Sequence, residues 1–293
     1  MKKINFIKIL FCFLLITQFC FSQVDVVYNN LVWSDEFDVN GAINSTNWFQ
    51  QTQLPSSGSW FNGEYQHYTN QLTNSFVNGG MLNIVAKKEP YTDQGITKQY
   101  TSARLNSKFA FKYGRVDVRA KLPIDAGTWP AIWMLGKNVN EPGGYFASTY
   151  GTTDWPACGE TDIMEHGIFS GQPINYIQST LHTPSSYGNS VNNGGTIASD
   201  LANNYHVYSV NWSPFQISFL LDGVIFYTYN PAVKDATTWP FDKDQYLLLN
   251  LAVGGVAGSK KSEIFAVTPG IALPFTSTSG SDPIDCKIVR AHV

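Results

Sequence analysis

Short runs of alternating apolar and polar residues recur along this chain, bounded by turn-forming residues. Such a period of two is typical of β-strands with one buried face. The pattern predicts strands at 81–87, 115–121, 176–182, 206–212, 216–221 and 224–229. Asp222-Gly223 separates the last two runs and is a strong hairpin-turn signal. Helical periodicity is scarce.

Residues 23–293 show no internal repeat, no linker rich in Pro, Ser and Thr, and no appended binding module. This length can bury one substantial all-β core. We therefore predict a single domain over 23–293, folded as an all-β sandwich, a jelly roll with a concave cleft. Loop 184–195, rich in Ser, Asn and Gly, is predicted to be a plain connector rather than a ligand site, although it could border the cleft.

The N-terminus begins with Met and two lysines, followed by an apolar run over 9–21. This pattern is typical of a secretory signal peptide and is too short for a membrane span. We expect a signal peptide at 1–22, with cleavage after Ser22, and an exported protein that is secreted, periplasmic or at the cell surface. A lipoprotein site at Cys20 is disfavoured because bulky Phe19 precedes it.

Two cysteines, Cys158 and Cys286, remain after that cleavage. Nothing in the sequence brings them together, so we expect two reduced thiols rather than a disulfide.

Aromatic residues make up 14% of the chain and charged residues also 14%, with a formal net charge of −3. This balance suits a groove that binds a neutral polymer. It argues against nucleic acid and against strongly sulfated polysaccharides, both of which favour basic surfaces. We expect a monomer without a membrane partner.

Three carboxylates are concentrated in one apolar segment, at Glu160, Asp162 and Glu165. On a strand, Glu160 and Asp162 share a face, and a β-bulge around Ile163-Met164 would return Glu165 to it. Two carboxyl groups about 5 Å apart, one ionised and one protonated, are required to cleave a glycosidic bond with retention. Solvated edge residues or calcium ligands are the alternative interpretation.

Two tryptophans, Trp129 and Trp133, have the same parity on one predicted strand upstream of the acids. Their flat faces could stack on sugar rings, or they could be core residues.

With these motifs the chain resembles glycoside hydrolase family 16, in its laminarinase-like branch. The resemblance spans most of residues 23–293. It rests on WSDEF at 33–37, WFNGEYQHYT at 60–69, YTSARL at 100–105, YGRVDVRAKLP at 113–123, GTWPAIWMLG at 127–136, GETDIMEH at 159–166, LHTP at 181–184, HVYSVNW at 206–212 and LLNLAVGG at 248–255.

The resemblance implies a double-displacement mechanism in which Glu160 is the nucleophile, Glu165 the general acid/base, and Asp162 lies between them. It also implies a set of cleft residues: Asn62, Glu64, Arg104, Trp129, Trp133 and His182. From the residues alone, Arg104 could instead form a surface ion pair and His182 could be a core histidine.

The chain departs from the family pattern near its C-terminus. Residues 254–258 lack a Trp that relatives often carry, so one sugar platform is expected to be missing. Lys287 falls where the last strand commonly supplies an Asp to a structural calcium site beside the residue matching Glu36. We therefore expect no cofactor and doubt the calcium. Segment 269–285 is predicted to be poorly ordered or to derive from an altered reading frame.

Three functions remain open. The leading one is an exported endo-β-1,3-glucanase acting on laminarin-like glucan, with mixed-linkage 1,3-1,4 chains as a further substrate. The others are an agar- or carrageenan-type galactan hydrolase of the same fold, and a non-catalytic β-glucan-binding protein. No catalytic metal is expected, because the five histidines show no paired ligand spacing.

Overall fold

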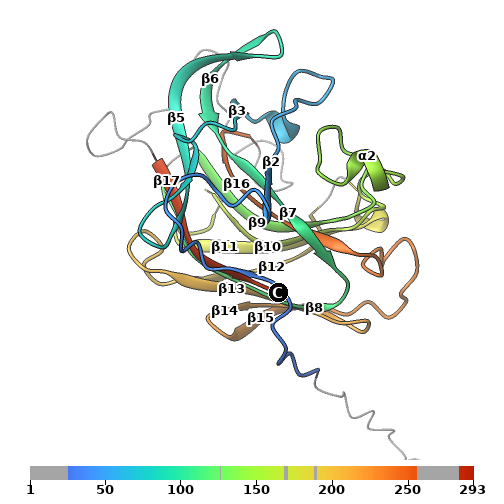
Figure 1. Cartoon of the computed structure of the whole chain (residues 1–293). Helices are drawn as coiled ribbons and strands as arrows, with labels where there is room; N and C mark the ends of the chain where they lie inside the picture. The colour runs from blue at the N-terminus through green and yellow to red at the C-terminus, as the bar shows by residue number, and fades with distance from the viewer. Residues whose placement is uncertain (1–25, 126, 168–170, 188–189, 256–283) are drawn as a thin grey trace, which may run out of the picture.

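The computed structural model describes residues 26–125, 127–167, 171–187, 190–255 and 284–293, which form two sheets packed face to face (Figure 1). The prediction of an all-β sandwich is confirmed. The predicted signal peptide at 1–22 lies outside the described residues. Within the described part, no helix has both the length and the apolar character needed to cross a membrane.

The larger sheet has ten strands and antiparallel pairing except between β3 and β6. In spatial order its main path is β15 (Val224–Tyr229), β14 (Ile217–Leu221), β13 (His206–Trp212), β8 (Gly114–Lys121), β17 (Ile284–His292), β5 (Leu82–Asp93), β6 (Ile96–Ser102) and β3 (Gln66–Tyr68). Strand β1 (Ser34–Asp35) pairs with β17, and β4 (Ser75–Val77) pairs with β5.

The smaller sheet has seven antiparallel strands and carries the chemistry described below. Its order is β12 (Asn192–Ile197), β11 (Tyr176–His182), β10 (Glu160–His166), β9 (Thr128–Gly136), β16 (Gln245–Val253), β7 (Arg104–Phe111) and β2 (Trp48–Gln50). Helical structure in the described ranges is limited to η1 (Phe61–Gly63), α2 (Ala147–Tyr150) and η2 (Pro184–Ser186).

All six predicted strands are present with shifts of at most one residue, except that β5 continues to Asp93. Its extension, from Lys88 onwards, alternates only between half-buried and exposed positions and so lacks an apolar signal. Between β14 and β15, Asp222 (φ 50°) and Gly223 (φ 81°) both adopt positive φ, as the predicted hairpin turn requires.

The core lies between the sheets, and strand alternation decides which side chains enter it. On β9, Ile132 and Met134 are buried in the core, whereas Trp133 between them points to the opposite face of the sheet. On β16, Leu249 and Leu251 are core residues and Asn250 lies on the other side. Each fully buried aliphatic side chain contributes roughly 1.5–3 kcal/mol. This burial fixes the orientation of the residues that face the cleft.

The C-terminal strand β17 completes the larger sheet, despite its atypical sequence, by pairing with β1, β5 and β8. Lys287 lies opposite Lys121, and the imidazole of His292 contacts the carboxylate of Glu36. The doubt about a structural calcium at this strand stays a prediction. Residues 269–283 of the predicted irregular segment lie outside the described part of the chain.

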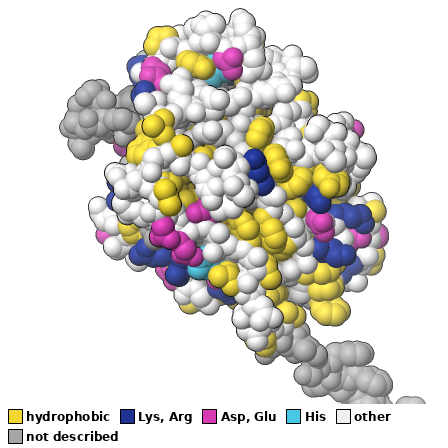
Figure 2. Space-filling model, viewed as in Figure 1, with side chains coloured by type: hydrophobic (Ala, Val, Ile, Leu, Met, Phe, Trp, Pro, Cys, Tyr) yellow, Lys and Arg dark blue, Asp and Glu magenta, His cyan; other side chains and the backbone are white. Residues whose placement is uncertain are grey.

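Cys158 and Cys286 are both buried and neither forms a disulfide, as expected. On the face of the molecule shown in Figure 2, Lys and Arg side chains are interspersed with acidic and apolar ones. That face carries no continuous basic patch of the kind that binds nucleic acid.

Candidate active site

Strand β10 contains the predicted β-bulge. Against β9, Glu160 pairs with Leu135 and Asp162 with Trp133, and after the irregularity Glu165 pairs with Ala131. Ile163 and Met164 are both buried in the core between the sheets. The extra residue therefore turns Glu165 back to the face of the other two acids.

A cavity of about 630 Å³ lies on this face of the seven-stranded sheet. All nine residues predicted for the site line it: Asn62, Glu64, Arg104, Trp129, Trp133, Glu160, Asp162, Glu165 and His182. Four strands of the sheet, together with the segment around η1, bring them together from sequence positions more than a hundred residues apart.

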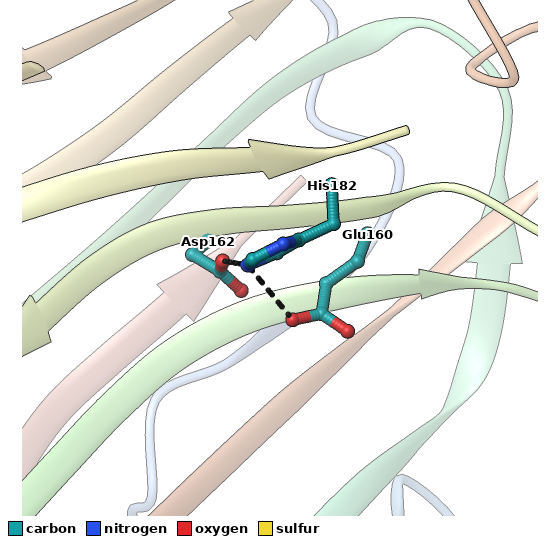
Figure 3. Close-up of side chains that lie close together, drawn as sticks. All are labelled: Glu160, Asp162 and His182. Carbon is teal, nitrogen blue, oxygen red and sulfur yellow. Dashed lines mark ion pairs between the residues drawn. The ribbon is translucent and has the colours of Figure 1, made fainter. Parts of the chain in front are cut away.

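His182 stands on β11 directly opposite Glu160. Its Nε2 lies 3.2 Å from Oδ2 of Asp162 and 3.7 Å from Oε1 of Glu160 (Figure 3). Burial alone would lower the pKa of His182, but the negative charges of Glu160 and Asp162 outweigh it and raise that pKa to about 10. The imidazole is therefore a cation at neutral pH and not an uncharged core histidine.

The pKa values of Asp162 and Glu165 are both raised, which favours their protonated forms. Burial, reinforced by the charges of Glu160 and Glu165, raises the pKa of Asp162 well above its ordinary value. Burial also raises the pKa of Glu165, to about 7, with the charge of Glu160 adding to it and that of His182 opposing it. The environment of the ladder therefore favours the protonated forms of Asp162 and Glu165.

Two indole groups hold the outer acids. Trp129 Nε1 donates to Oε1 of Glu165 at 3.1 Å, and Trp155 Nε1 donates to Oε2 of Glu160 at 2.8 Å. Trp129 is only 9% exposed, so it orients Glu165 rather than offering an open platform. Trp133 remains half-buried on the cavity wall and donates to Asn250 Oδ1 at 2.7 Å.

Arg104 does not form a surface ion pair. It is 3% exposed, and its Nη2 lies 2.8 Å from each carboxylate oxygen of Glu141. Its guanidinium also lies 4.8 Å from the centre of the Trp133 ring. Although burial opposes it, the charge of Glu141 raises the pKa of Arg104, so a permanent cation packs against the ring of the cleft residue Trp133.

Asn62 and Glu64 lie at one rim of the cavity. Asn62 is exposed within η1 with a positive φ of 59°. Glu64 accepts hydrogen bonds from Gln66 Nε2 at 2.6 Å and the Tyr68 hydroxyl at 2.9 Å, and burial raises its pKa. The same Tyr68 hydroxyl accepts from Asn250 Nδ2 at 3.0 Å. This network joins the rim to the centre of the sheet.

Next to this rim, Gly254 and Gly255 have positive φ values of 72° and 87°. A Cβ on Gly255 would come within 3.0 Å of the Trp129 ring, so the backbone packs directly on that indole. Residues 256–258, where a further tryptophan was expected to be missing, lie outside the described residues.

Among the lining residues that the sequence did not indicate, four take part in the contacts described above: Tyr68, Glu141, Trp155 and Asn250. Tyr68 and Asn250 lie inside family motifs, Trp155 precedes the motif at 159–166, and all three have the polar or aromatic character of a sugar site. Glu141 carries no sequence signal, because its role arises only from its long-range pairing with Arg104.

Glu160, Asp162 and His182 are also close enough to hold a metal ion, with one potential ligand atom from each within 4.8 Å. Linear spacing does not reveal this group, since cross-strand pairing creates it. A histidine ligand must be uncharged, whereas here the acids keep the imidazole protonated. The trio therefore fits an internal ion pair better than a cation site.

Comparisons with known proteins agree with this geometry. Residues 58–266 match the model of the glycosyl hydrolases family 16. A β-glucanase from Rhodothermus marinus is 38% identical over 242 residues, covering 79% of this chain and 78% of that protein. A glucan endo-1,3-beta-glucosidase A1 from Niallia circulans is 38% identical over 77% of this chain, which spans 34% of that longer protein.

Among solved structures, a variant of LamA from Z. galactanivorans in complex with laminaritriose and laminaritetraose is 40% identical, with a TM-score of 0.76. The alignment covers 91% of this chain and 99% of that one. With the family match, the two-sheet fold and the bulged acid strand in agreement, this chain belongs to glycosyl hydrolase family 16.

Proposed function

We propose that this protein is an exported endo-β-1,3-glucanase that cleaves laminarin-like glucan with retention of anomeric configuration. The observation that carries the proposal is the bulged strand β10, which turns three carboxyl groups to one cleft between indole donors. The proteins that this chain is similar to include a β-glucanase, a glucan endo-1,3-beta-glucosidase and a structure in complex with laminaritriose and laminaritetraose.

We assign the two steps of the reaction to the outer acids of the ladder. Glu165 starts protonated and donates its proton to the glycosidic oxygen, while the Glu160 carboxylate attacks the anomeric carbon. The bond to the leaving sugar breaks, and a covalent glycosyl-enzyme remains on Glu160. Glu165, now ionised, takes a proton from water as the water oxygen attacks the anomeric carbon. The bond to Glu160 breaks, and the sugar leaves with its original configuration.

Asp162 and His182 have supporting roles in this proposal. Asp162 pairs with the His182 imidazole beside Glu160, so the charges of these two side chains depend on each other. The His182 cation balances the charge of the nucleophile from the neighbouring strand. Trp155 fixes the second oxygen of Glu160 and leaves Oε1 on the side of His182.

The charges lining the cavity favour a neutral substrate. The acids Glu64, Glu141, Glu160, Asp162 and Glu165 outnumber the bases Arg104 and His182, and both bases pair with acids. A sulfated galactan would bring anionic groups next to Glu160 and Glu141, and both bases among the described lining residues are already paired with acids. The half-buried face of Trp133 offers an apolar surface suited to a glucose ring.

The purified protein should be assayed on laminarin, barley β-glucan, agarose and carrageenan, with the configuration of the first product followed by proton NMR. The proposal expects hydrolysis of laminarin, with the β-anomer appearing first. Preferential cleavage of agarose or carrageenan would identify a galactan hydrolase instead. Binding to laminarin without any turnover would make the protein a glucan-recognition module. Export can be tested by following the mature N-terminus, which should begin at Gln23.

A further inference from the structure

A second hollow, of about 470 Å³, lies beyond the Arg104–Glu141 pair. It is lined by Phe49, Gln53 and residues of the segment 140–148. Residues Asn140, Glu141 and Pro142 line both this hollow and the catalytic cavity. The loop 140–142 therefore borders both spaces. We call this space the distal hollow.

The distal hollow lies at the same face of the sheet as the acids. Phe49 is on β2, opposite Asn106, and its neighbour Trp48 is buried in the core between the sheets. Phe49 must therefore point to the cleft side. Four strand spacings separate β10 from β2, which corresponds to about 19 Å. A polymer crossing the strands from the acids over Trp133 would arrive at this point.

Its chemistry fits a neutral sugar. Tyr145 is 36% exposed, and its ring lies 5.6 Å from that of Phe49. The exposed amides of Gln53 and Asn140 and the hydroxyl of Ser148 supply hydrogen-bonding groups. Glu141 is the one charged side chain in the lining, and both of its carboxylate oxygens are bound by Arg104. Aromatic surface with uncharged polar groups suits a polyol rather than an ion.

The loop that shapes the hollow is held in place before any ligand binds. Glu141 is anchored by Arg104, and Pro142 O accepts from Gln51 Nε2 at 3.4 Å. Tyr145 N donates to Oδ1 of Asn106 at 3.2 Å. Gly143, with φ 77°, packs so closely on Gln53 that a Cβ would lie 2.5 Å from its side chain. Such preorganisation lowers the entropy that binding must otherwise overcome.

We propose that the distal hollow is a remote sugar subsite, in which Tyr145 and Phe49 receive a glucosyl unit several residues away from the bond that is cleaved. This proposal rests on the proposed function, because the occupant is the same glucan chain that lies over the acids. A sugar bound in this hollow would make the enzyme prefer long over short glucan chains.

The test compares the trimer and heptamer of β-1,3-linked glucose on wild type and variants. Tyr145→Ala should lower kcat/KM on the heptamer roughly five-fold, the value of one aromatic contact, and leave the trimer unchanged. Tyr145→Phe, which keeps the ring, should behave as wild type. Tyr150→Ala is the matched control, because Tyr150 is 45% exposed on the adjacent helix α2 but does not line the hollow.

Gln53→Ala provides a second, exposed substitution and should also weaken the heptamer selectively. Equal effects of Tyr145→Ala on trimer and heptamer, or no effect on either, with thermal unfolding unchanged, would overturn the subsite. If Tyr145→Ala does not fold, an unchanged heptamer-to-trimer ratio in Gln53→Ala overturns it. A wild-type protein that cleaves neither oligomer would refute the proposed function itself, which the variants cannot do.

Discussion

Nε2 of His182 lies 3.2 Å from Oδ2 of Asp162, on an adjacent strand whose register places the histidine opposite Glu160. The imidazole thus shares its positive charge between a nucleophile and the carboxyl group beside it. The same charge lowers the pKa of Glu165, against the larger effect of burial, which raises it. One residue on β11 therefore lowers the pKa of two acids on β10, Asp162 and Glu165, against the effect of burial.

The first prediction concerns the pH profile. Glu165 must be protonated to start the reaction, so kcat/KM should be high at acidic pH and fall as pH rises through about 7. In His182→Gln the cation that lowers the pKa of Glu165 is lost, so this alkaline limb should move to higher pH while kcat decreases. Profiles of kcat/KM on laminarin measure the shift. A limb that stays in place would show that His182 does not act on Glu165.

The second prediction separates the nucleophile from the other acids. Glu160→Ala should have no measurable turnover of laminarin, because no group remains to attack the anomeric carbon. Added azide should enter the vacated space and release a glycosyl azide of inverted configuration, which NMR detects. Rescue by azide in Asp162→Ala but not in Glu160→Ala would reverse the assignment of these two residues.

The third prediction addresses the general acid/base. Glu165→Ala should reduce kcat on laminarin by roughly 10²- to 10⁴-fold, the usual contribution of a positioned proton donor. Aryl glycosides with activated leaving groups need no proton, so formation of their glycosyl-enzyme should be largely spared. A burst of aryl alcohol followed by slow turnover is the expected signature. If the variant matched wild type on laminarin, another group would be the acid.

Much of this site could be predicted because strand alternation is a local property. The parity of Glu160 and Asp162, and the extra residue needed to align Glu165, follow from a period of two and the need for retention geometry. The same parity puts Trp129 and Trp133 on one face. Parity does not distinguish the roles of these two tryptophans. In the structure Trp129 donates a hydrogen bond to Glu165 and so orients that acid.

What could not be predicted depends on contacts between distant segments. Glu141 lies in a loop without strand periodicity, and only the folded sheet brings Arg104 beneath it. The proximity of His182 to Glu160 and Asp162 likewise arises from the register of β10 and β11 rather than from sequence spacing. The C-terminal strand has few family residues, yet Cys286 and Ile288 still alternate into the core.

The fourth prediction is that activity does not depend on a metal. The proposed steps use carboxyl groups only, and the protonated His182 occupies the position between Glu160 and Asp162. Prolonged dialysis against EDTA should therefore leave kcat on laminarin and the Tm unchanged. A fall in kcat at constant Tm, restored by a divalent cation, would reveal a catalytic metal. A fall in Tm alone would instead indicate a structural ion.

The last prediction tests the buried ion pair between Arg104 and Glu141 in the cavity wall. Glu141→Ala leaves the Arg104 guanidinium, whose side chain is 4% exposed, without its carboxylate, and should lower the free energy of unfolding by about 3–5 kcal/mol. In a domain of this size that corresponds to a Tm lower by roughly 10 °C.

Asp244→Ala is the matched control, since Asp244 pairs with Lys137 at 3.8 Å and its side chain is 46% exposed. Its removal should change the free energy of unfolding by less than about 0.5 kcal/mol. Adding Arg104→Met to Glu141→Ala should recover much of the loss, because no unpaired charge then remains buried. Equal Tm values for Glu141→Ala and Asp244→Ala would show that the buried pair does not stabilise the fold.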